Sequence, residues 1–395
     1  MRVAYICADP GIPVFGTKGA SVHVQEVIKG MLQRGAEVVL FAQRLGGETP
    51  PELRQIDIHK LPELPNDSQQ ERAAAALAAN TQVEKLLESA GDFDLVYERY
   101  SLWSNAGMAF ARKHQCVGIL EVNAPLIEEQ KKHRELPLEA QAQDIAEFVF
   151  SHADAMVAVS PGVKDYLETF ASAKGRVHVI ANGVDLARFA SAASQNAEKF
   201  LHRPSDYVAT PVLGFLGTLK PWHGVSGLVQ AWSLLRRRGY PLNLLIVGDG
   251  PQHAALSEEI AQQGLSEFVH FTGAVAPEQV PEWLARMDIA VAPYPNLDGF
   301  YFSPLKIYEY MAAGLPIIAT QVGHLSTVIE NGYNGILVEA DNPQNMAEGI
   351  ARLLDNPSEA QQLGANARAT AEQHHSWLAV VDRILHIARD CQRRG

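Results

Sequence analysis

The chain has 395 residues, 47% of them hydrophobic, which suits two or three globular domains of ~100 to 200 residues with packed cores. These values exclude a disordered or fibrous protein. Its 33 Lys and Arg residues against 45 Asp and Glu residues give a formal net charge of -12, which repels nucleic acid and anionic membranes. We therefore expect no nucleic-acid partner, and any anionic ligand has to be bound by a local group of donors.

No segment predicts export or membrane insertion. No stretch reaches the ~18 consecutive apolar residues of a membrane-spanning helix, and the first residues, MRVAYICADPG, lack the apolar core and cleavage site of a signal peptide. The cysteines Cys7, Cys116 and Cys391 are too far apart for a metal-ligand motif or a disulfide framework. We expect a soluble, cytoplasmic enzyme whose three cysteines are small buried residues.

The first half of the chain alternates short apolar runs with stretches of helical period. This alternation predicts repeated βα units and an α/β fold with parallel sheets. The run VAYICA (3–8) indicates a strand, and a loop rich in Gly and Pro leads to a helix that ends near Gly35. Further strands are expected at 37–42, 94–98, 117–122, 154–160 and 176–182. These elements predict one doubly wound, Rossmann-like domain over residues 1–195.

A second series of βα units follows a polar segment. Residues 190–210 are small and polar, include a proline and show no sustained period, so we place the domain boundary there. Strands are then expected at 212–217, 243–248, 268–271 and 288–293, with helices between them. They predict a second Rossmann-like domain over residues 205–374. A last helix, from about 375 to 395, has an apolar face that includes Trp377 and Val381.

The segment FSPLKIYEYMAAGLPIIAT (302–320) predicts an anion site at the start of a helix. Ser303 is a good N-cap and Pro304 fits the first helical position, so the N–H groups of Leu305 and Lys306 have no partner inside the helix. A cation in the first turn opposes the helix dipole, and Lys306 is best explained if it shares a phosphate with those amides.

Glu309 lies in the same helix, between Leu305, Tyr308 and Ala312 on an apolar face. A carboxylate in such surroundings needs partners, because burying it alone is unfavourable. Two interpretations stay open: a salt bridge within the fold, or a carboxylate that accepts two hydroxyls of a ligand such as ribose.

The loop after the first strand, residues 8–21, contains Gly11, Gly16 and Gly19 and leads into a helix that starts near Ser21. Glycines let the backbone approach a phosphate at a helix N-terminus. The spacing differs from the GxGxxG fingerprint, so a nicotinamide cofactor is poorly supported. A phosphate-binding loop and a plain flexible loop are both compatible with the sequence.

The second domain has a comparable loop, FLGTLKPWHGV (215–225), in which Lys220 and His223 lie between a strand end and a helix start. Open α/β sheets bind ligands at the carboxyl ends of their strands, which favours a functional role over that of ordinary surface side chains. The tripeptide GDG (248–250) also ends a strand, although it can simply form a tight turn.

Four polar side chains follow buried strands of the first domain, namely Glu98, Arg99, Glu121 and Asn123. Their position at the carboxyl edge suits an acceptor pocket. No GxSxG, HExxH or P-loop motif supports a serine hydrolase, a zinc protease or an NTPase. The basic run KKHR (131–134) is flanked by acidic residues and indicates a solvated helix face, with contact to anionic lipid at the inner membrane as the alternative.

Together these features resemble a family 4 glycosyltransferase of the GT-B fold. The resemblance covers almost the whole chain and rests on the Gly loop (16–19), ADAMVAVSPGVKDYL (153–167), VIANGVDLARF (179–189), FLGTLKPWHGV (215–225), LLIVGDGP (244–251), VHFTGAV (269–275) and KIYEYMAAGLPIIAT (306–320). The family implies two domains facing across a cleft, with a nucleotide diphosphate sugar in the second and an acceptor in the first. It also implies retaining transfer and a final helix that crosses back to the first domain.

By this resemblance, Glu309 corresponds to the second Glu of the family's Glu-seven-residues-Glu motif and binds the ribose hydroxyls. Tyr301 stands where the first Glu is expected, and Asp298 in the preceding loop is the candidate substitute. Gly248 and Val275, in two of the matching segments, are assigned to the donor site as well.

The family's diphosphate-binding Arg and Lys correspond to Thr218 and His223, so the resemblance implies that Lys220 or Lys306 supplies the lost charge. Asn123 stands where many members have a His near the reacting sugar, and it cannot act as a titrating base. Catalysis would then rely on Lys220, His223 and Lys306 to stabilise the leaving diphosphate. No Asp-x-Asp motif is present, and neither a metal nor a further cofactor is expected.

The preferred hypothesis is a retaining glycosyltransferase that moves a sugar from a UDP-sugar, or next from GDP-mannose, to a hydroxyl acceptor in polysaccharide or glycoconjugate synthesis. The acceptor is a sugar, a lipid-linked molecule or a small molecule. An alternative is a nucleotide-sugar-binding protein of the same fold with little catalysis. A third is another GT-B enzyme, such as an epimerase or a phosphorylase. The sequence alone does not decide the base, the sugar or the acceptor.

Overall fold

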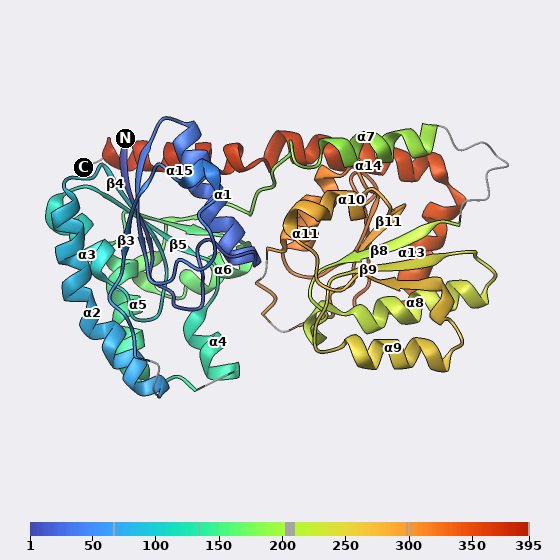
Figure 1. Ribbon diagram of the computed structural model, residues 1–395, viewed down its shortest axis with the longest axis horizontal. Helices are drawn as coiled ribbons and strands as arrows, with labels where there is room; N and C mark the ends of the chain where they lie inside the picture. The colour runs from blue at the N-terminus through green and yellow to red at the C-terminus, as the bar shows by residue number, and fades with distance from the viewer. Residues whose placement is uncertain (66–67, 134, 202–209, 298, 302, 394–395) are drawn as a thin grey trace. The chain divides into compact units, whose positions relative to one another are not determined.

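The computed structural model describes residues 1–65, 68–133, 135–201, 210–297, 299–301 and 303–393. The chain forms two compact units, drawn in Figure 1. The first unit contains Met1–Asn182 together with Trp377–Gly395, and the second contains Gly183–Ser376. The first unit is thus made from two separate stretches of chain. No helix in the described ranges is long and apolar enough to cross a membrane.

A seven-stranded parallel sheet forms the centre of the first unit, in the order β3-β2-β1-β4-β5-β6-β7. Its strands are β1 (Arg2–Cys7), β2 (Glu37–Ala42), β3 (Asp57–Lys60), β4 (Leu95–Arg99), β5 (Val117–Val122), β6 (Ala155–Ala158) and β7 (Val177–Val179). The strands expected from the sequence are present, and β3 is an addition. The order reverses between β1 and β4, which places a ligand-binding switch point at the carboxyl edge there.

The first unit also contains helices (Figure 1). They are α1 (Gly19–Gln33), α2 (Gln69–Ala90), α3 (Ala106–His114), α4 (Leu126–His133), α5 (Glu139–His152), α6 (Pro161–Leu167) and α15 (Trp377–Gln392), with short 3-10 turns at Pro51–Leu53 and Ala171–Ala173. The last helix, α15, packs on α1, β5 and β6. Gly30 permits this approach, because a Cβ atom there would lie 2.6 Å from Val381 Cγ2. The last helix therefore completes the core of the first unit.

A six-stranded parallel sheet forms the centre of the second unit, in the order β10-β9-β8-β11-β12-β13. Its strands are β8 (Val212–Leu216), β9 (Asn243–Val247), β10 (Val269–Phe271), β11 (Ile289–Ala292), β12 (Ile317–Thr320) and β13 (Ile336–Val338). The order reverses between β8 and β11. The second unit is therefore also doubly wound, with its own switch point at the carboxyl edge.

The helices of the second unit are α7 (Ala190–Leu201), α8 (Val225–Arg237), α9 (His253–Gln262), α10 (Val280–Leu284), α11 (Leu305–Ala312), α12 (Leu325–Val328), α13 (Pro343–Asp355) and α14 (Pro357–His374). Three 3-10 turns lie at Pro221–His223, Ser266–Phe268 and Pro277–Gln279. Helices α8 and α13 pack together over a core that includes Phe215, Trp232 and Ile350. Helix α14 packs on α11 and α7.

The polar segment expected as a linker is helical over its first half. Residues 190–201 form α7, where Ala192 and Asn196 are buried. The Asn196 side-chain amide donates to the Ala313 carbonyl at 2.8 Å. The helix was missed because small residues, rather than large apolar ones, make its buried face. The first unit consequently ends at Asn182, before the boundary placed on the sequence, and residues 202–209 lie outside the described ranges.

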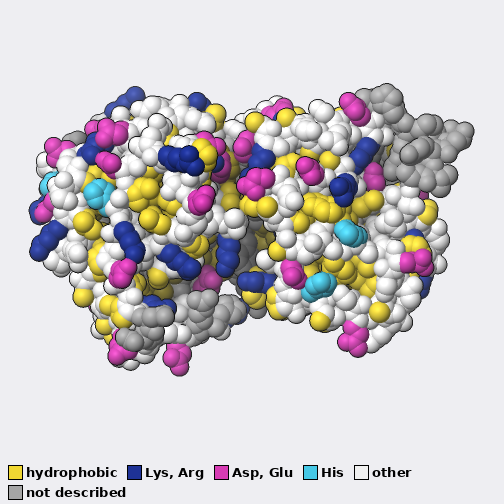
Figure 2. All heavy atoms as spheres, viewed as in Figure 1, with side chains coloured by type: hydrophobic (Ala, Val, Ile, Leu, Met, Phe, Trp, Pro, Cys, Tyr) yellow, Lys and Arg dark blue, Asp and Glu magenta, His cyan; other side chains and the backbone are white. Residues whose placement is uncertain are grey.

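Basic and acidic side chains are interspersed on the face shown in Figure 2. The basic run that begins at Lys131 lies at the end of α4, and Lys131 Nζ pairs with Glu139 Oε1 at 2.6 Å, both side chains being nearly half exposed. Arg134 lies outside the described residues. The described contacts support a solvated helix face for this run.

The expectation of three buried cysteines is wrong for two of them. Cys7 is buried within β1, whereas Cys116 and Cys391 are partly exposed. Cys116 immediately precedes β5 and Cys391 lies near the end of α15, so both are at the ends of elements rather than inside them.

Candidate functional site

Two glycine-containing loops meet at the carboxyl edge of the second sheet. Gly217 follows β8 with φ of +139°, and Gly248 follows β9 with φ of +137°. A Cβ atom on Gly248 would lie 2.1 Å from the carbonyl oxygen of Gly217. The loops are further joined by the Leu219 amide, which donates to the Asp249 carbonyl at 3.0 Å. Glycine is therefore required at Gly248, both for its backbone conformation and for this close contact.

Lys306 is a buried cation beside these loops. It is 7% exposed, and its Nζ atom lies 4.1 Å from the ring centroid of Phe215 and 5.1 Å from that of Tyr294. A Cβ atom on Gly217 would lie 2.8 Å from Nζ, so the amine faces the loop. In the described part of the chain, Nζ has no hydrogen-bond acceptor. Burial lowers the pKa of Lys306 to about 7, and Glu309 partly opposes this. Such an amine is suited to an anionic ligand.

Helix α11, which carries Lys306, begins at Leu305, one residue later than expected. Pro304 occupies the N-cap position in an extended conformation, and the Ser303 hydroxyl bonds to the Tyr308 hydroxyl at 3.0 Å instead of capping the helix. The Ile307 amide donates to the Pro304 carbonyl at 3.2 Å. Within the described residues, the amides of Leu305 and Lys306 have no such acceptor. They remain available for a ligand.

His223 reaches the same cluster as a neutral imidazole. Its Nδ1 atom donates to the Thr218 carbonyl, and its ring centroid lies 5.6 Å from that of Tyr294. Burial and the charge of Lys306 lower the pKa of His223 to about 4. In the neutral tautomer set by Thr218, Nε2 carries a lone pair and accepts hydrogen bonds. Direct donation to a diphosphate would therefore require this ring to gain a proton.

Lys220 and Thr218 lie nearer the surface. The Lys220 amine lies 4.8 Å from the ring centroid of Trp222, which is 40% exposed. Thr218 is exposed. The structure thus brings the buried Lys306 and the half-buried His223 together around Tyr294, and it places the Lys220 amine over an exposed ring.

Glu309 projects from α11 and is 21% exposed. The nearest cation in the described structure is Arg188, whose Nη2 atom lies 4.0 Å from Glu309 Oε1 and also donates to the Pro277 carbonyl at 3.0 Å. Burial raises the pKa of Glu309, and Arg188 and Lys306 oppose this rise. The salt bridge is long, and the described residues make no hydrogen bond to the carboxylate, so its oxygens can accept ligand hydroxyls.

The remaining donor-site candidates lie in loops of both units. Val275 is half-buried in the loop between β10 and Pro277, and Tyr301 is half-buried just before Ser303. Asp298 lies outside the described residues. In the first unit, the Gly16 amide donates to the Pro13 carbonyl at 2.8 Å. Gly19 is the first residue of α1, which therefore starts before the position expected at Ser21.

Glu121 is the centre of a buried polar network at the carboxyl edge of the first sheet. Its Oε1 atom accepts from Arg99 Nη1 at 2.8 Å and from Asn123 Nδ2 at 2.7 Å. Its Oε2 atom contacts His23 Nε2 at 2.9 Å and accepts from the Tyr97 hydroxyl. Burial alone would raise the pKa of Glu121, but the charges of His23 and Arg99 and these hydrogen bonds lower it to about 2. The network brings three of the four expected acceptor-site residues together.

Glu98 does not join this network. It is fully buried on the opposite face of the sheet, because successive residues of a strand point to opposite sides. Its Oε1 atom accepts from the Ser104 hydroxyl at 2.5 Å. A Cβ atom on Gly107 of α3 would lie 2.3 Å from Oε2, so Glu98 fills the space under the first turn of α3. This burial corrects its expected place in an acceptor pocket.

Comparisons with known proteins agree with both units. The family model described as Glycosyltransferase Family 4 matches residues 17–188, and the one described as Glycosyl transferases group 1 matches residues 210–356. The D-inositol 3-phosphate glycosyltransferase of Streptosporangium roseum is 25% identical over 394 residues, which cover 93% of this chain and 87% of that protein. This chain belongs to the family 4 glycosyltransferases.

Solved structures show that this glycosyltransferase has the GT-B fold. Sucrose-phosphate synthase of Thermosynechococcus elongatus superposes with a TM-score of 0.74 and 20% identity, covering 100% of both chains. HepE of Anabaena in complex with UDP superposes with a TM-score of 0.71 and 19% identity, covering 99% of this chain and 100% of that one. Further structures of HepE contain UDP with glucose, and UDP-glucose.

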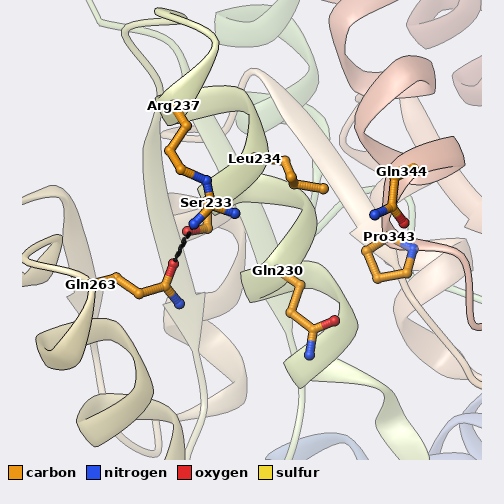
Figure 3. A pocket seen from close by; sticks show the side chains of 7 residues that line it. All are labelled: Gln230, Ser233, Leu234, Arg237, Gln263, Pro343 and Gln344. Atoms are coloured by element: carbon orange, nitrogen blue, oxygen red, sulfur yellow. Dashed lines mark hydrogen bonds between the residues drawn. The ribbon is translucent and has the colours of Figure 1, made fainter.

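The glycosyltransferase has a surface pocket outside the loops described above. It has a volume of about 340 Å³ and is lined by Gln230, Ser233, Leu234, Arg237, Gln263, Pro343 and Gln344. In Figure 3, Ser233 of α8 bonds to Gln263, while Pro343 and Gln344 of α13 form another side of the pocket. None of the donor or acceptor candidates lines it.

Three side chains of this glycosyltransferase were missed by sequence reasoning. His23 and Tyr97 contact Glu121, and Arg188 approaches Glu309. His23 could have been recognised because it is a polar residue next to Val24, on the otherwise apolar face of its helix. Arg188 lies in VIANGVDLARF, one of the segments that carry the resemblance.

Proposed function

We propose that this glycosyltransferase moves a sugar from a nucleoside diphosphate sugar to an acceptor hydroxyl, with retention at the anomeric carbon, in polysaccharide or glycoconjugate synthesis. The observation that carries the proposal is the buried Lys306 amine, which has no acceptor in the described chain and faces Gly217. UDP is the proposed carrier, and GDP-mannose is the second candidate donor. The complexes of HepE with UDP and UDP-glucose support the first choice.

In this proposal the diphosphate lies between Lys306, the amides of Leu305 and Lys306, and the loop at Gly248. A helix N-terminus and a buried ammonium both favour a dianionic group. Glu309 accepts the ribose hydroxyls, which suits a carboxylate with no hydrogen bond from the described chain. Val275 and Tyr301 are proposed as further contacts to the donor.

The proposed chemistry depends on stabilising the leaving group. The bond between the anomeric carbon and the diphosphate oxygen breaks, its electron pair stays with the diphosphate, and an oxocarbenium-like sugar forms. The acceptor hydroxyl attacks the same face and gives its proton to a diphosphate oxygen, since the amide of Asn123 cannot act as a base. Lys306, Lys220 and a protonated His223 stabilise the negative charge that develops, and no metal is required.

The acceptor is proposed to lie at the carboxyl edge of the first sheet, beside Arg99 and Asn123. Glu121 holds both side chains in place through its hydrogen bonds. Glu98 is omitted from this proposal because it is fully buried under α3.

A thermal-shift panel of nucleoside diphosphates tests the proposal. A ligand that binds the folded state at about 100 times its dissociation constant stabilises it by about 2.7 kcal/mol. We expect UDP to raise the melting temperature. We also expect the enzyme to turn over the UDP-sugars that it binds, and NMR of the product should show the same anomeric configuration as in the donor. No shift with any nucleotide in folded protein would refute the proposal. Binding without turnover would favour the alternative of a nucleotide-sugar-binding protein.

A further inference from the structure

We infer that the acceptor of this glycosyltransferase carries an oxyanion, a phosphate or a carboxylate, that is bound by the guanidinium of Arg99. The inference rests on the proposed function in one respect, namely that the first unit binds the acceptor. It assigns the acceptor a chemical class in addition to its reacting hydroxyl.

Glu121 has no capacity left for a ligand. An ionised carboxylate offers about four lone-pair positions. Arg99 and Asn123 contact Oε1, and His23 and Tyr97 contact Oε2. Glu121 therefore acts as a positioning residue, and the groups that it holds are the ones that face a ligand.

Most N–H donors of the Arg99 guanidinium have no acceptor in the described chain. A guanidinium has five N–H donors. In the described chain Arg99 donates one hydrogen bond, to Glu121, while its side chain is only 11% exposed. Asp9, the acid near the end of β1, accepts from the Gly11 amide and makes no ion pair with Arg99 in the described structure. In the described chain, the remaining nitrogens of this guanidinium have no protein acceptor and are not fully enclosed, so they can reach a ligand.

The charges around Glu121 are also compatible with an anionic ligand. Glu121 lies between Arg99 and His23, so the network is neutral when the imidazole is neutral and cationic when it is protonated. In neither state does it repel an anion. A planar guanidinium binds carboxylate or phosphate through two parallel hydrogen bonds, which gives orientation as well as affinity.

Arg99 lies where doubly wound sheets bind their ligands. It is the last residue of β4, and β4 pairs with β1 at the point where the strand order reverses. Ligands of doubly wound sheets bind outside the carboxyl ends of the strands at this point. Asn123, whose second N–H and carbonyl oxygen are not used by Glu121, lies beside it to bind a hydroxyl.

The test measures the binding of inorganic phosphate and of acetate to the full chain by calorimetry. Two backgrounds keep phosphate out of the proposed diphosphate site: wild-type protein saturated with UDP, and Lys306→Met protein without UDP. Arg99→Gln removes the charge, and Arg99→Lys keeps the charge without the planar fork. Arg54→Gln, at an exposed arginine of the same unit, is the matched control.

We expect one of the two anions to bind, and its affinity to fall at least about tenfold in Arg99→Gln, as for the loss of a charge-assisted hydrogen bond. The anion affinity of Arg99→Lys should lie between those of the wild type and Arg99→Gln, and the affinity of Arg54→Gln should equal that of the wild type. Phosphate binding alone indicates a phosphorylated acceptor, and acetate binding alone indicates a carboxylate. If neither binds, or if binding persists in Arg99→Gln, the inference is wrong.

A double variant distinguishes the loss of anion binding from a loss of folding. Arg99→Gln combined with Glu121→Gln keeps the network neutral and should fold as judged by near-ultraviolet circular dichroism, yet still not bind the anion. If the proposed function is wrong, UDP does not bind. In that case, anion binding to the Lys306→Met protein without UDP still tests whether Arg99 binds the anion.

Discussion

The Nζ atom of Lys306 lies 4.1 Å from the ring centroid of Phe215, and no acceptor of the described chain forms a hydrogen bond with it. A buried ammonium without a hydrogen-bonded counter-ion destabilises the folded state, since burial opposes its charge. The same isolation leaves the amine available for an anionic ligand. Stability and ligand binding therefore make opposite demands on this side chain.

Replacing Lys306 by Met should separate these two demands. Met keeps a long flexible chain against the Phe215 ring and removes the charge. We expect the free energy of unfolding to rise by about 1 to 3 kcal/mol at pH 6. UDP affinity should fall by more than about tenfold, because a charge-assisted contact is lost. Urea unfolding and calorimetry measure the two effects. Lower stability with unchanged affinity would contradict the assignment.

The affinity for UDP should depend on pH through Lys306. Burial lowers the pKa of its amine to about 7, so the unliganded protein loses this charge above pH 7. A bound diphosphate favours the charged form of the Lys306 amine. The affinity for UDP should therefore fall by up to about tenfold per pH unit from pH 7 to about pH 9. Over the interval from pH 7 to the ordinary value of 10.5 the unfolded chain binds more protons, so this group's contribution to stability rises with pH.

Lys306→Arg is the control for this pH profile, since a guanidinium stays charged over the whole interval. Its UDP affinity should be nearly constant between pH 7 and about pH 9. A wild-type profile equally flat would mean that Lys306 does not titrate with the ligand.

Glu309→Ala tests the ribose assignment. We expect UDP to bind more than about tenfold less tightly, because two hydroxyls lose a carboxylate acceptor. Wild-type protein should discriminate UDP from 2′-deoxy-UDP, and the variant should not. Glu282→Ala, at an exposed position of α10, is the matched control. Unchanged discrimination in Glu309→Ala would return Glu309 to a salt bridge with Arg188.

Lys220→Ala separates catalysis from binding. Lys220 lies over the exposed Trp222 ring rather than beside the buried Lys306, so its removal should leave uridine binding nearly unchanged. If its amine assists the leaving diphosphate, turnover should fall by about 100-fold, the usual effect of losing one such donor. Initial rates and uridine affinity are compared with those of Lys164→Ala, a partly exposed lysine that lies near Glu168. Equal small effects on both quantities would make Lys220 a surface residue.

Replacing Glu121 and Glu98, the two buried glutamates at the carboxyl edge of the first sheet, by Gln should have opposite effects on the free energy of unfolding. The pKa of Glu121 is held at about 2 despite burial, by His23 and Arg99, so its contribution to stability is complete above its ordinary value of 4.5 and lost toward pH 2. Glu121→Gln should lower the free energy of unfolding at pH 7 by about 3 to 5 kcal/mol, because Arg99 loses its partner.

Burial raises the pKa of Glu98 to about 7, so the stability associated with its protonated form is lost as pH rises through 7. Glu98→Gln should therefore be neutral or slightly stabilising at pH 8. Urea unfolding of both variants at pH 5 and pH 8 checks the contrast. A large loss of stability in Glu98→Gln at pH 8 would show that this carboxyl is ionised and paired.

The strands that the sequence predicted share one property, which is a run of buried apolar residues such as VAYIC of β1. Strand β3 was missed because its residues, DIHK, are mostly polar and none is fully buried. Its formation depends on pairing with β2, which a local pattern does not contain. Helix α7 was missed for the related reason that alanines and a buried Asn196 form its packed face.

The candidate site was less predictable than the fold, because its chemistry depends on pairs of side chains. The first-turn amides of Leu305 and Lys306 followed from helix geometry. The state of His223 did not, since it depends on Thr218, Lys306 and burial together. Likewise, the sequence placed Glu98 and Glu121 at one rim, whereas strand alternation puts them on opposite faces and gives their carboxyls opposite pKa shifts.

The packing of α15 on α1, with Val381 set against Gly30, has a consequence for biosynthesis. During translation, residues 1–182 leave the ribosome with the apolar face of α1 still uncovered, and the helix that covers it follows the whole second unit. The first unit is therefore the first to be synthesised, but its fold is completed only after the second unit has been synthesised. Until then, its α1 face is the surface on which we expect a chaperone to act.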